Sequence, residues 1–191
     1  MPDVYISDQT IDRNSLIQNP LAKGEYENCA FKTCDLSNRD LSGFKFLECE
    51  FIGCDLSLTK LSKTSLQNIR FRNCKLMGLN FYNCNDFGLS FSFDDCILNH
   101  SSFYKMKLKK TAFKNSQLKE TDFVECDLSN SIFDNCDLAS AIFENSILEK
   151  VDFRTSFNYV IDPEMNRIKG AKFSLPGVAG LLVKYELEIE N

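Results

Sequence analysis

The sequence is short of the residues on which most catalytic sites depend. It has no tryptophan, a single histidine, His100, and only eight glycines among 191 residues. It contains no glycine-rich phosphate loop and no serine nucleophile elbow, and His100 has no partner motif, so neither a nucleotide-binding nor a hydrolytic enzyme is indicated. We therefore expect no enzymatic activity and no cofactor.

Long apolar runs are also missing. The sequence has no apolar stretch of about eighteen residues and no basic, apolar leader at its N-terminus. These absences predict a cytoplasmic protein without membrane contact.

Cysteine, in contrast, is plentiful, with nine residues. Each stands two residues before a position of a five-residue repeat, which favours small buried hydrophobes in a reducing compartment. The alternative is a metal site formed from the pairs Cys29 with Cys34 and Cys49 with Cys54. This spacing is wider than that of common metal-binding knuckles, and the lone histidine completes no ligand motif. We therefore expect no metal.

An apolar residue recurs at every fifth position over most of the chain. The series runs from Ile6 to Phe91 and, after a break of two extra residues, from Leu98 to Phe153. Of these thirty positions, which we call centres, only Asp86 is polar. The position two before each centre, which we call the corner position, is usually Cys, Ser, Thr or Ala. This internal repeat determines the fold.

A period of five suits neither an α-helix nor a flat strand. Five residues advance a helix by about 500°, and an odd period alternates between the two faces of a strand. Only a chain that turns once per repeat keeps every centre inward, which gives a closed coil stacked on itself. Four sides per coil would stack residues twenty apart, and this aligns similar residues: Phe31, Phe51, Phe71 and Phe91.

Segments such as 34–38 and 126–130, both Cys-Asp-Leu-Ser-Asn, resemble the repeats of the pentapeptide repeat family. The resemblance implies an all-β fold, a right-handed quadrilateral β-helix. It covers residues 24–153 as regular coils within a single domain of residues 1–191. Residues 1–23 would form a lead-in coil, and residues 154–191 would form a C-terminal cap and dimerisation segment.

The two ends of the chain resemble the Qnr-type proteins of this family. Residues 10–16 are similar to their lead-in, and residues 171–173 with Leu181 and Leu182 are similar to their last repeat and C-terminal helix. This resemblance implies a DNA mimic that binds DNA gyrase or topoisomerase IV and protects it from quinolones. Relatives with strong protection project two loops, and here only the two-residue break interrupts the repeat. A solenoid scaffold for an unrelated protein partner is therefore the alternative.

The C-terminal cap is predicted to contain a short α-helix. Ser174 suits the N-cap and Pro176 the first turn, and the helix would run to about Lys184, followed by a strand-like alternation to Ile189. The helix presents more apolar surface than is needed to cover one end of the coil stack. Because Qnr-type relatives dimerise through this part, the resemblance implies a two-fold homodimer. The candidate contacts are Val178, Leu181, Leu182 and Tyr185.

Charge changes sign along the coils. Residues 104–119 contain six lysines and no acid, whereas residues 120–152 contain nine acids and one lysine. The two stretches can attract each other across neighbouring coils as a solvated surface, or the acids can form a partner-binding belt that imitates DNA. The candidates for that belt are Glu120, Asp122, Glu125, Asp127, Asp134, Asp137, Glu144 and Asp152. A net charge of −5 argues against direct binding of nucleic acid.

The one polar centre marks an irregular coil. A buried, unpaired carboxylate is strongly destabilising, so we expect Asp86 to turn outward and Phe87 to take the inward place. Together with the break in the repeat, this predicts a distorted coil over residues 82–97. The distortion is either a harmless bulge or a partner contact.

Overall fold

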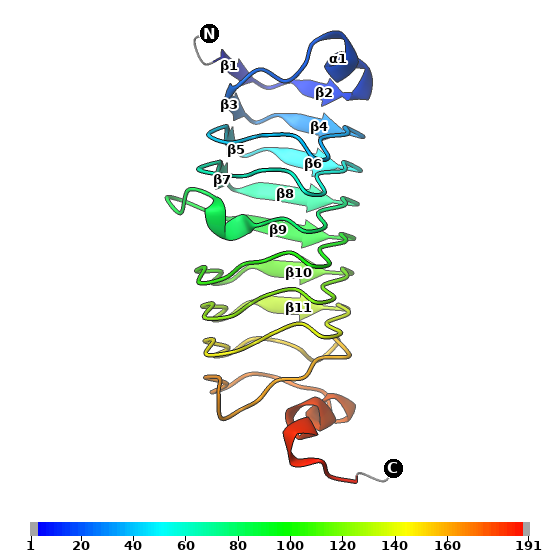
Figure 1. The fold of residues 1–191 in the computed structure, drawn as a ribbon, viewed down its shortest axis with the longest axis vertical. Helices are drawn as coiled ribbons and strands as arrows, with labels where there is room; N and C mark the ends of the chain where they lie inside the picture. Colours follow the sequence, from blue (N-terminus) through cyan, green and yellow to red (C-terminus); the bar gives the residue numbers. More distant parts are fainter. Residues whose placement is uncertain (1–3, 189–191) are drawn as a thin grey trace.

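The computed structural model describes residues 4–188 and shows a rod of stacked coils with the two termini at opposite ends (Figure 1). Two parallel sheets run along the rod. One contains, in order, β1 (Val4–Ser7), β3 (Gly24–Glu27), β5 (Lys45–Leu47) and β7 (Ser65–Gln67). The other contains β2 (Thr10–Asp12), β4 (Ala30–Lys32), β6 (Glu50–Ile52), β8 (Ile69–Arg72), β9 (Phe91–Asp94), β10 (Ala112–Lys114) and β11 (Ile132–Asp134). No helix among residues 4–188 is long and apolar enough to cross a membrane.

Each coil has four sides. Phe113, Leu118, Phe123 and Leu128 are successive centres, and we name the four faces of the rod after them. Backbone pairing links residues twenty apart along each face: Ala112 with Ile132, Gln117 with Asp137, Asp122 with Ile142, and Asp127 with Ile147. The four-sided β-helix, which the twenty-residue alignment favours and the family resemblance implies, is confirmed.

The chain turns at the residue two after each centre, where the backbone is left-handed. The angle φ is 48° at Asn115, 53° at Glu120 and 62° at Asn130. This conformation is unfavourable for most residues and is tolerated best by asparagine and glycine, which explains why asparagine recurs at this position. The turn is held by the next coil, since the N–H of Glu120 donates to the carbonyl of Ala139 at 2.9 Å.

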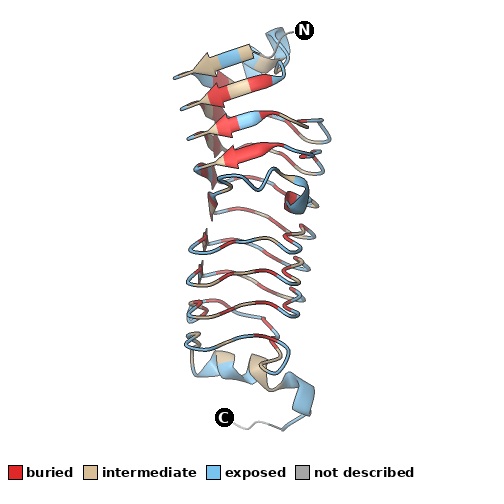
Figure 2. Cartoon of the chain, turned by 90° about the vertical axis from the view of Figure 1, so that its left-hand side faces the viewer, coloured by how far each residue is buried: buried red, intermediate tan, exposed pale blue. Residues whose placement is uncertain are grey.

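The interior is packed with phenylalanine and leucine. Buried residues recur in coil after coil along the rod (Figure 2). Along the rod, rings stack in parallel: the centroids of Phe103 and Phe123 are 5.2 Å apart, with 2° between the planes. Across the rod, rings from adjacent faces meet edge-on, as do Phe113 and Phe123 at 5.9 Å. Both arrangements suit the quadrupoles of aromatic rings. The rod is therefore filled by its own side chains.

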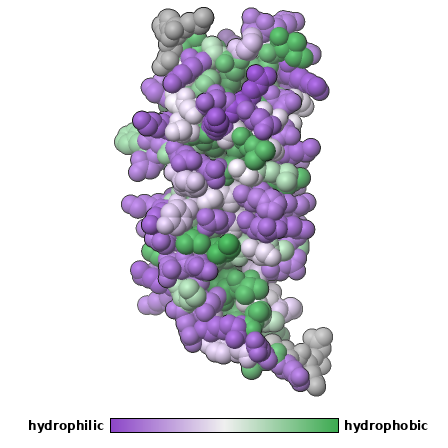
Figure 3. All heavy atoms as spheres, in the orientation of Figure 1, coloured by the Kyte–Doolittle hydropathy of each residue, from purple (hydrophilic) through white to green (hydrophobic). Residues whose placement is uncertain are grey.

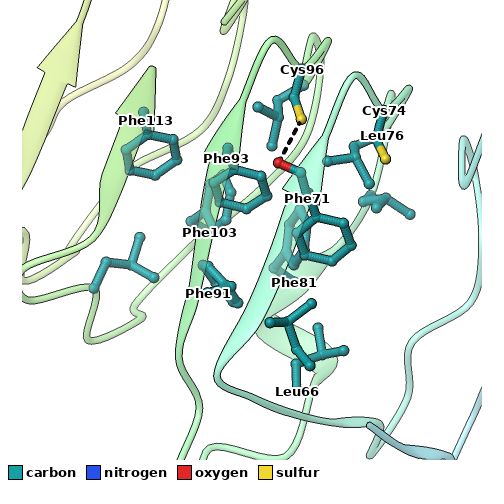
Figure 4. Close-up of a cluster of buried hydrophobic side chains, with 14 of the residues drawn as sticks. Leu66, Phe71, Cys74, Leu76, Phe81, Phe91, Phe93, Cys96, Phe103 and Phe113 are labelled. Atoms are coloured by element: carbon teal, nitrogen blue, oxygen red, sulfur yellow. Dashed lines mark hydrogen bonds between the residues drawn. The ribbon is translucent and has the colours of Figure 1, made fainter. Parts of the chain in front are cut away.

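Corner side chains bond to the backbone of the preceding coil. The Ser131 hydroxyl donates to the Leu108 carbonyl at 2.6 Å and accepts from the Thr111 N–H at 3.1 Å. Cysteine makes the same contact, as Figure 4 shows for Cys96, whose Sγ donates to the Phe71 carbonyl at 3.5 Å. A buried backbone group without a partner is destabilising. Corners therefore favour Cys, Ser and Thr because these are both small and able to donate.

The irregular coil differs from its prediction. Asp86 points outward as expected, but Phe87 is 76% exposed and does not enter the core. The extra residues precede β9, so Phe93 rather than Phe91 stacks on Phe71, at a centroid distance of 5.3 Å. Phe91 stands in the corner position instead. Its large ring fills the space left by the missing centre, and this leaves no place inside for Phe87.

The predicted C-terminal helix is present, but it is not an α-helix. It consists of two 3-10 helices, η2 (Pro176–Leu181) and η3 (Val183–Tyr185). Gly177 and Gly180 weaken α-helical winding in this segment. In addition, the Gly180 carbonyl, which a continuing α-helix would use, accepts from the N–H of Ile161 at 3.1 Å. Docking onto the last coil thus replaces regular helical bonds.

Both ends of the rod contain a further departure from expectation. A short helix, α1 (Arg13–Gln18), was not predicted, although Asp12 caps it by accepting from the Ser15 N–H at 2.8 Å. At the other end, residues 185–188 form no strand. Glu186, with φ of 50°, ends the regular backbone there, and Ile189 lies outside the described residues.

We expect Ser131→Ala to lower the free energy of unfolding by about 1–3 kcal/mol, because the Leu108 carbonyl loses the shorter of its two hydrogen bonds in a dry corner and keeps only that from the Thr111 N–H at 3.3 Å. Ser131→Cys should retain most of the stability, since cysteine makes this contact elsewhere. Urea denaturation followed by circular dichroism measures both changes. The control is Gln117→Ala on the exposed wall, expected within about 0.5 kcal/mol of wild type. Equal losses for the two alanine variants would contradict the role given to the corner hydroxyl.

Candidate protein-binding surface

The described part of the chain contains no cluster that could hold a metal: no group of three or more His, Cys, Asp or Glu side chains is suitably placed among residues 4–188. The nine cysteines are free, and all but Cys84 are fully buried. Burial raises the pKa of Cys84 and of Cys126 to about 12, so both thiols are protonated and poorly reactive at neutral pH. Side chains able to contact another molecule lie on the outer wall, one side of which is mostly hydrophilic with hydrophobic patches (Figure 3).

Half of the candidate acids stabilise a turn of the backbone. An aspartate just before a centre accepts a hydrogen bond from the N–H two residues later, as Asp122 does from Val124 at 2.9 Å. The other candidates with this contact are Asp127, Asp137 and Asp152. The same turn occurs far from the belt, at Asp35, Asp40 and Asp55. Aspartate at this position therefore follows from turn geometry and does not by itself indicate a partner.

Much of the acidic charge is also neutralised by neighbouring bases. The pairs across coils are Lys105 with Glu125 at 3.4 Å, Lys109 with Asp127 at 3.0 Å and Lys119 with Asp137 at 3.1 Å. Within one coil, the hydrogen bond from the Arg154 guanidinium holds the pKa of Asp152 below its usual range. The predicted attraction between the lysine stretch and the acidic stretch is confirmed. Such exposed pairs add little stability, but they cancel charge.

The coil geometry distributes the acids over all four faces. Asp127 lies on the Leu128 face, Asp137 on the Leu118 face, and Asp134 and Asp152 on the Phe113 face. The other four candidates gather on the Phe123 face and its edges. We call this group the acidic face: Glu120, Asp122, Glu125 and Glu144.

The acidic face keeps most of its negative charge. Residues 120–125 form one side of a coil, and Glu144 lies on the next coil, where its carbonyl accepts from the Glu125 N–H at 2.8 Å. Glu120 lies 3.3 Å from His100, which is charged only when protonated. Among residues 4–188, Asp122 and Glu144 have no basic side chain within 4.0 Å. Three of the four carboxylates thus lack a permanently charged partner.

The candidate dimer contacts divide between the core and the surface. Leu181 packs against the core of its own chain, and Leu182 is half-buried. Val178 and Tyr185 are exposed. Leu175, which the sequence analysis did not single out, is 88% exposed.

Comparison with protein families classifies the chain. It matches the family described as "Pentapeptide repeat region" over residues 25–92 and 89–157. The chain belongs to the pentapeptide repeat family. The family resemblance carried by the five-residue ladder is therefore confirmed. No curated protein matches the chain at a significant level.

Two solved structures illustrate what the chain is similar to. QnrB1, a plasmid-mediated fluoroquinolone resistance protein, is 19% identical, with 97% of this chain and 98% of that chain covered and a TM-score of 0.48. HetL, a pentapeptide repeat protein involved in heterocyst differentiation regulation in the cyanobacterium Nostoc, is 16% identical, with 91% and 85% covered and a TM-score of 0.44. Identities and scores this low say nothing about a shared function.

We expect a thiol reagent to label at most one cysteine of the native protein, Cys84, and all nine after denaturation, because the other eight are buried. Mass spectrometry counts the labels. Cys84→Ser should abolish native labelling, whereas Cys126→Ser, at a buried corner, should leave it unchanged. Rapid labelling of several sites, or a native disulfide, would contradict this assignment.

Proposed function

We propose that this chain is a non-catalytic, protein-binding solenoid that engages DNA gyrase or topoisomerase IV through its acidic face. The observation that carries the proposal is the uncompensated charge of that face, where Asp122 and Glu144 have no basic neighbour within 4.0 Å among residues 4–188 and Glu120 faces only a histidine. An enzyme that binds DNA presents a basic surface, which such a face complements.

The resemblance of the two chain ends to Qnr-type proteins supports the choice of partner. It points to an enzyme whose DNA-binding surface accepts a rod in place of a duplex. A regular rod whose outer side chains repeat every coil, at about 4.8 Å, can present carboxylates in register as DNA presents phosphates.

The charge density of the rod sets the expected strength of this imitation. A DNA duplex carries one negative charge per about 1.7 Å of axis, and the acidic face supplies four carboxylates over two coils. It therefore replaces a short stretch of phosphates rather than a long duplex. Binding should weaken steeply as salt rises, because exposed charges are screened within about 10 Å at 0.1 M salt.

Reversing the three glutamates of the acidic face to lysine, as Glu120→Lys, Glu125→Lys and Glu144→Lys together, should abolish any effect on gyrase. Their side chains accept no backbone hydrogen bond, unlike Asp122, so the fold should remain intact. The measurement is gyrase supercoiling with and without a fluoroquinolone, at low and high salt, together with a circular dichroism melt.

Glu48→Lys is the matched control for this experiment. Glu48 is exposed and occupies the same left-handed turn position as Glu120 and Glu125, with φ of 53°, 53° and 56°. It lies on a distant coil and should leave the gyrase effect unchanged. Absence of gyrase binding by the wild-type protein at low salt would remove the proposal.

We also propose that two copies associate through the C-terminal segment. Leu175 is 88% exposed and Val183 is 53% exposed, and Val178 and Tyr185 add further exposed apolar surface near them. Apolar surface grouped in this way usually marks an interface. Leu181, in contrast, serves as the cap by packing on the core of its own chain.

Sedimentation equilibrium at high micromolar concentration should therefore show a dimer, and Leu175→Asp with Val183→Asp should convert it to a monomer. The control is Ile17→Asp, a residue that is 72% exposed on α1 at the opposite end of the rod. It should leave the dimer intact. A monomeric wild-type protein would show that the segment is only a cap.

A further inference from the structure

The loop before β9 projects from the side of the rod (Figure 1). The segment is still attached to the preceding coil: Asn85 bridges Ser65, and the Gln67 side-chain amide donates to the Phe87 carbonyl at 3.1 Å. Toward the following coil the pairing is lost after Phe81, whose N–H donates to Ser102 at 2.9 Å, and it resumes only with β9 and β10. One side of a single coil thus has no strand above it.

Four backbone groups on residues 104–109 are left without a hydrogen-bond partner among residues 4–188. They are the carbonyls of Tyr104, Lys107 and Lys109 and the N–H of Lys107. The equivalent groups of the next coil are all paired. Val124, Asp127 and Ser129 accept from Lys105, Leu108 and Lys110 at 3.0, 2.7 and 3.1 Å, and the Asp127 N–H donates to Met106 at 2.9 Å. Residues 104–109 are therefore an open strand edge in the middle of the rod.

A groove lies over this edge, at the corner between the Phe123 and Leu128 faces. Its volume is about 630 Å³, and its lining includes Tyr82, Cys84, Leu89, Tyr104 and Met106. The rings of Tyr82 and Tyr104 meet edge-on at 6.4 Å, and both are partly exposed. The groove thus combines free backbone groups with apolar side chains, as sites that bind an extended peptide do.

The charge at the groove selects its occupant. Residues 104–110 contain four lysines and no acid. Lys105 and Lys109 are paired with the next coil, whereas Lys107 and Lys110 have no carboxylate within 4.0 Å among residues 4–188. The acid in the groove lining, Asp86, belongs to the loop. Lysines beside an open edge repel basic strands and attract acidic ones.

We propose that this groove binds an extended acidic segment of a partner protein, which adds as a β-strand to residues 104–109. Its backbone would pair with the free groups of Tyr104, Lys107 and Lys109, and its carboxylates would meet Lys107 and Lys110. This inference goes beyond the proposed function and does not depend on gyrase.

The test uses the full-length, isotope-labelled protein and the blocked hexapeptide Glu-Val-Glu-Val-Glu-Val, with Lys-Val-Lys-Val-Lys-Val as its counterpart. We expect the acidic peptide to bind at least about tenfold more tightly than the basic one, a difference of about 1.4 kcal/mol. At saturation it should slow hydrogen exchange of the Lys107 amide at least about tenfold, because that N–H becomes paired. Both quantities are measured by NMR.

Lys107→Glu with Lys110→Glu should remove binding of the acidic peptide, and both residues are exposed enough to change without loss of the fold. Lys150→Glu is the matched control, because Lys150 and Lys110 share the same turn position, with φ of 59° in each. It should leave binding unchanged. Equal binding of the two peptides, an unprotected Lys107 amide at saturation, or unchanged binding to the double variant would each overturn the proposal. No gyrase is used, so this outcome is separate from that of the gyrase assay.

Discussion

The structure depends on one constraint, which is that each coil must satisfy its backbone hydrogen bonds with the coils above and below it. On the flat sides this is ordinary parallel pairing at twenty-residue steps. At the corners, where strands end, the small side chain of the corner position supplies the hydrogen bond. Ser131 and Cys96 each donate to a carbonyl of a preceding coil. The same contact explains why so many cysteines occur in a chain without disulfides.

The same constraint determines part of the surface charge. Aspartates such as Asp122 and Asp127 precede a centre and accept a hydrogen bond from the turn that follows. Many acids of the belt are therefore present for the turn, and some are also neutralised by lysines of the coil before. Charge available for a partner is what remains after both effects. It is concentrated on the acidic face, where Glu120 and Glu144 have neither role.

The loop before β9 is where the constraint is broken. Here, in the middle of the rod, Lys107 has an N–H and a carbonyl with no hydrogen-bond partner among the described residues. The break does not disturb the core, because Phe91 fills the space of the missing centre, 5.4 Å from the ring of Phe81. The core thus remains packed, although the backbone of the wall beside it is unpaired. The open edge is therefore a feature of the surface on which the stability of the rod does not depend.

The sequence by itself determined the turn at every repeat, the inward centres, the small corners and the outward turn of Asp86. A period of five can keep one face apolar only if the chain turns at every repeat, so these features need no knowledge of distant contacts. Attraction between the lysine stretch and the acids was also predictable, since residues twenty apart become neighbours.

The tertiary structure alone decided the rest. Phe91 and Phe93 are equally suited to be a centre, and only the pairing of Phe93 with Phe71 shows which one is, and hence where the extra residues lie. The acids form one run in sequence, but the four-sided coil places Asp127 and Asp137 on opposite faces. The C-terminal helix follows local signals until Gly180 bonds to Ile161 of the last coil, and that contact determines its 3-10 form. In each case the deciding interaction joins residues that the chain order does not bring together.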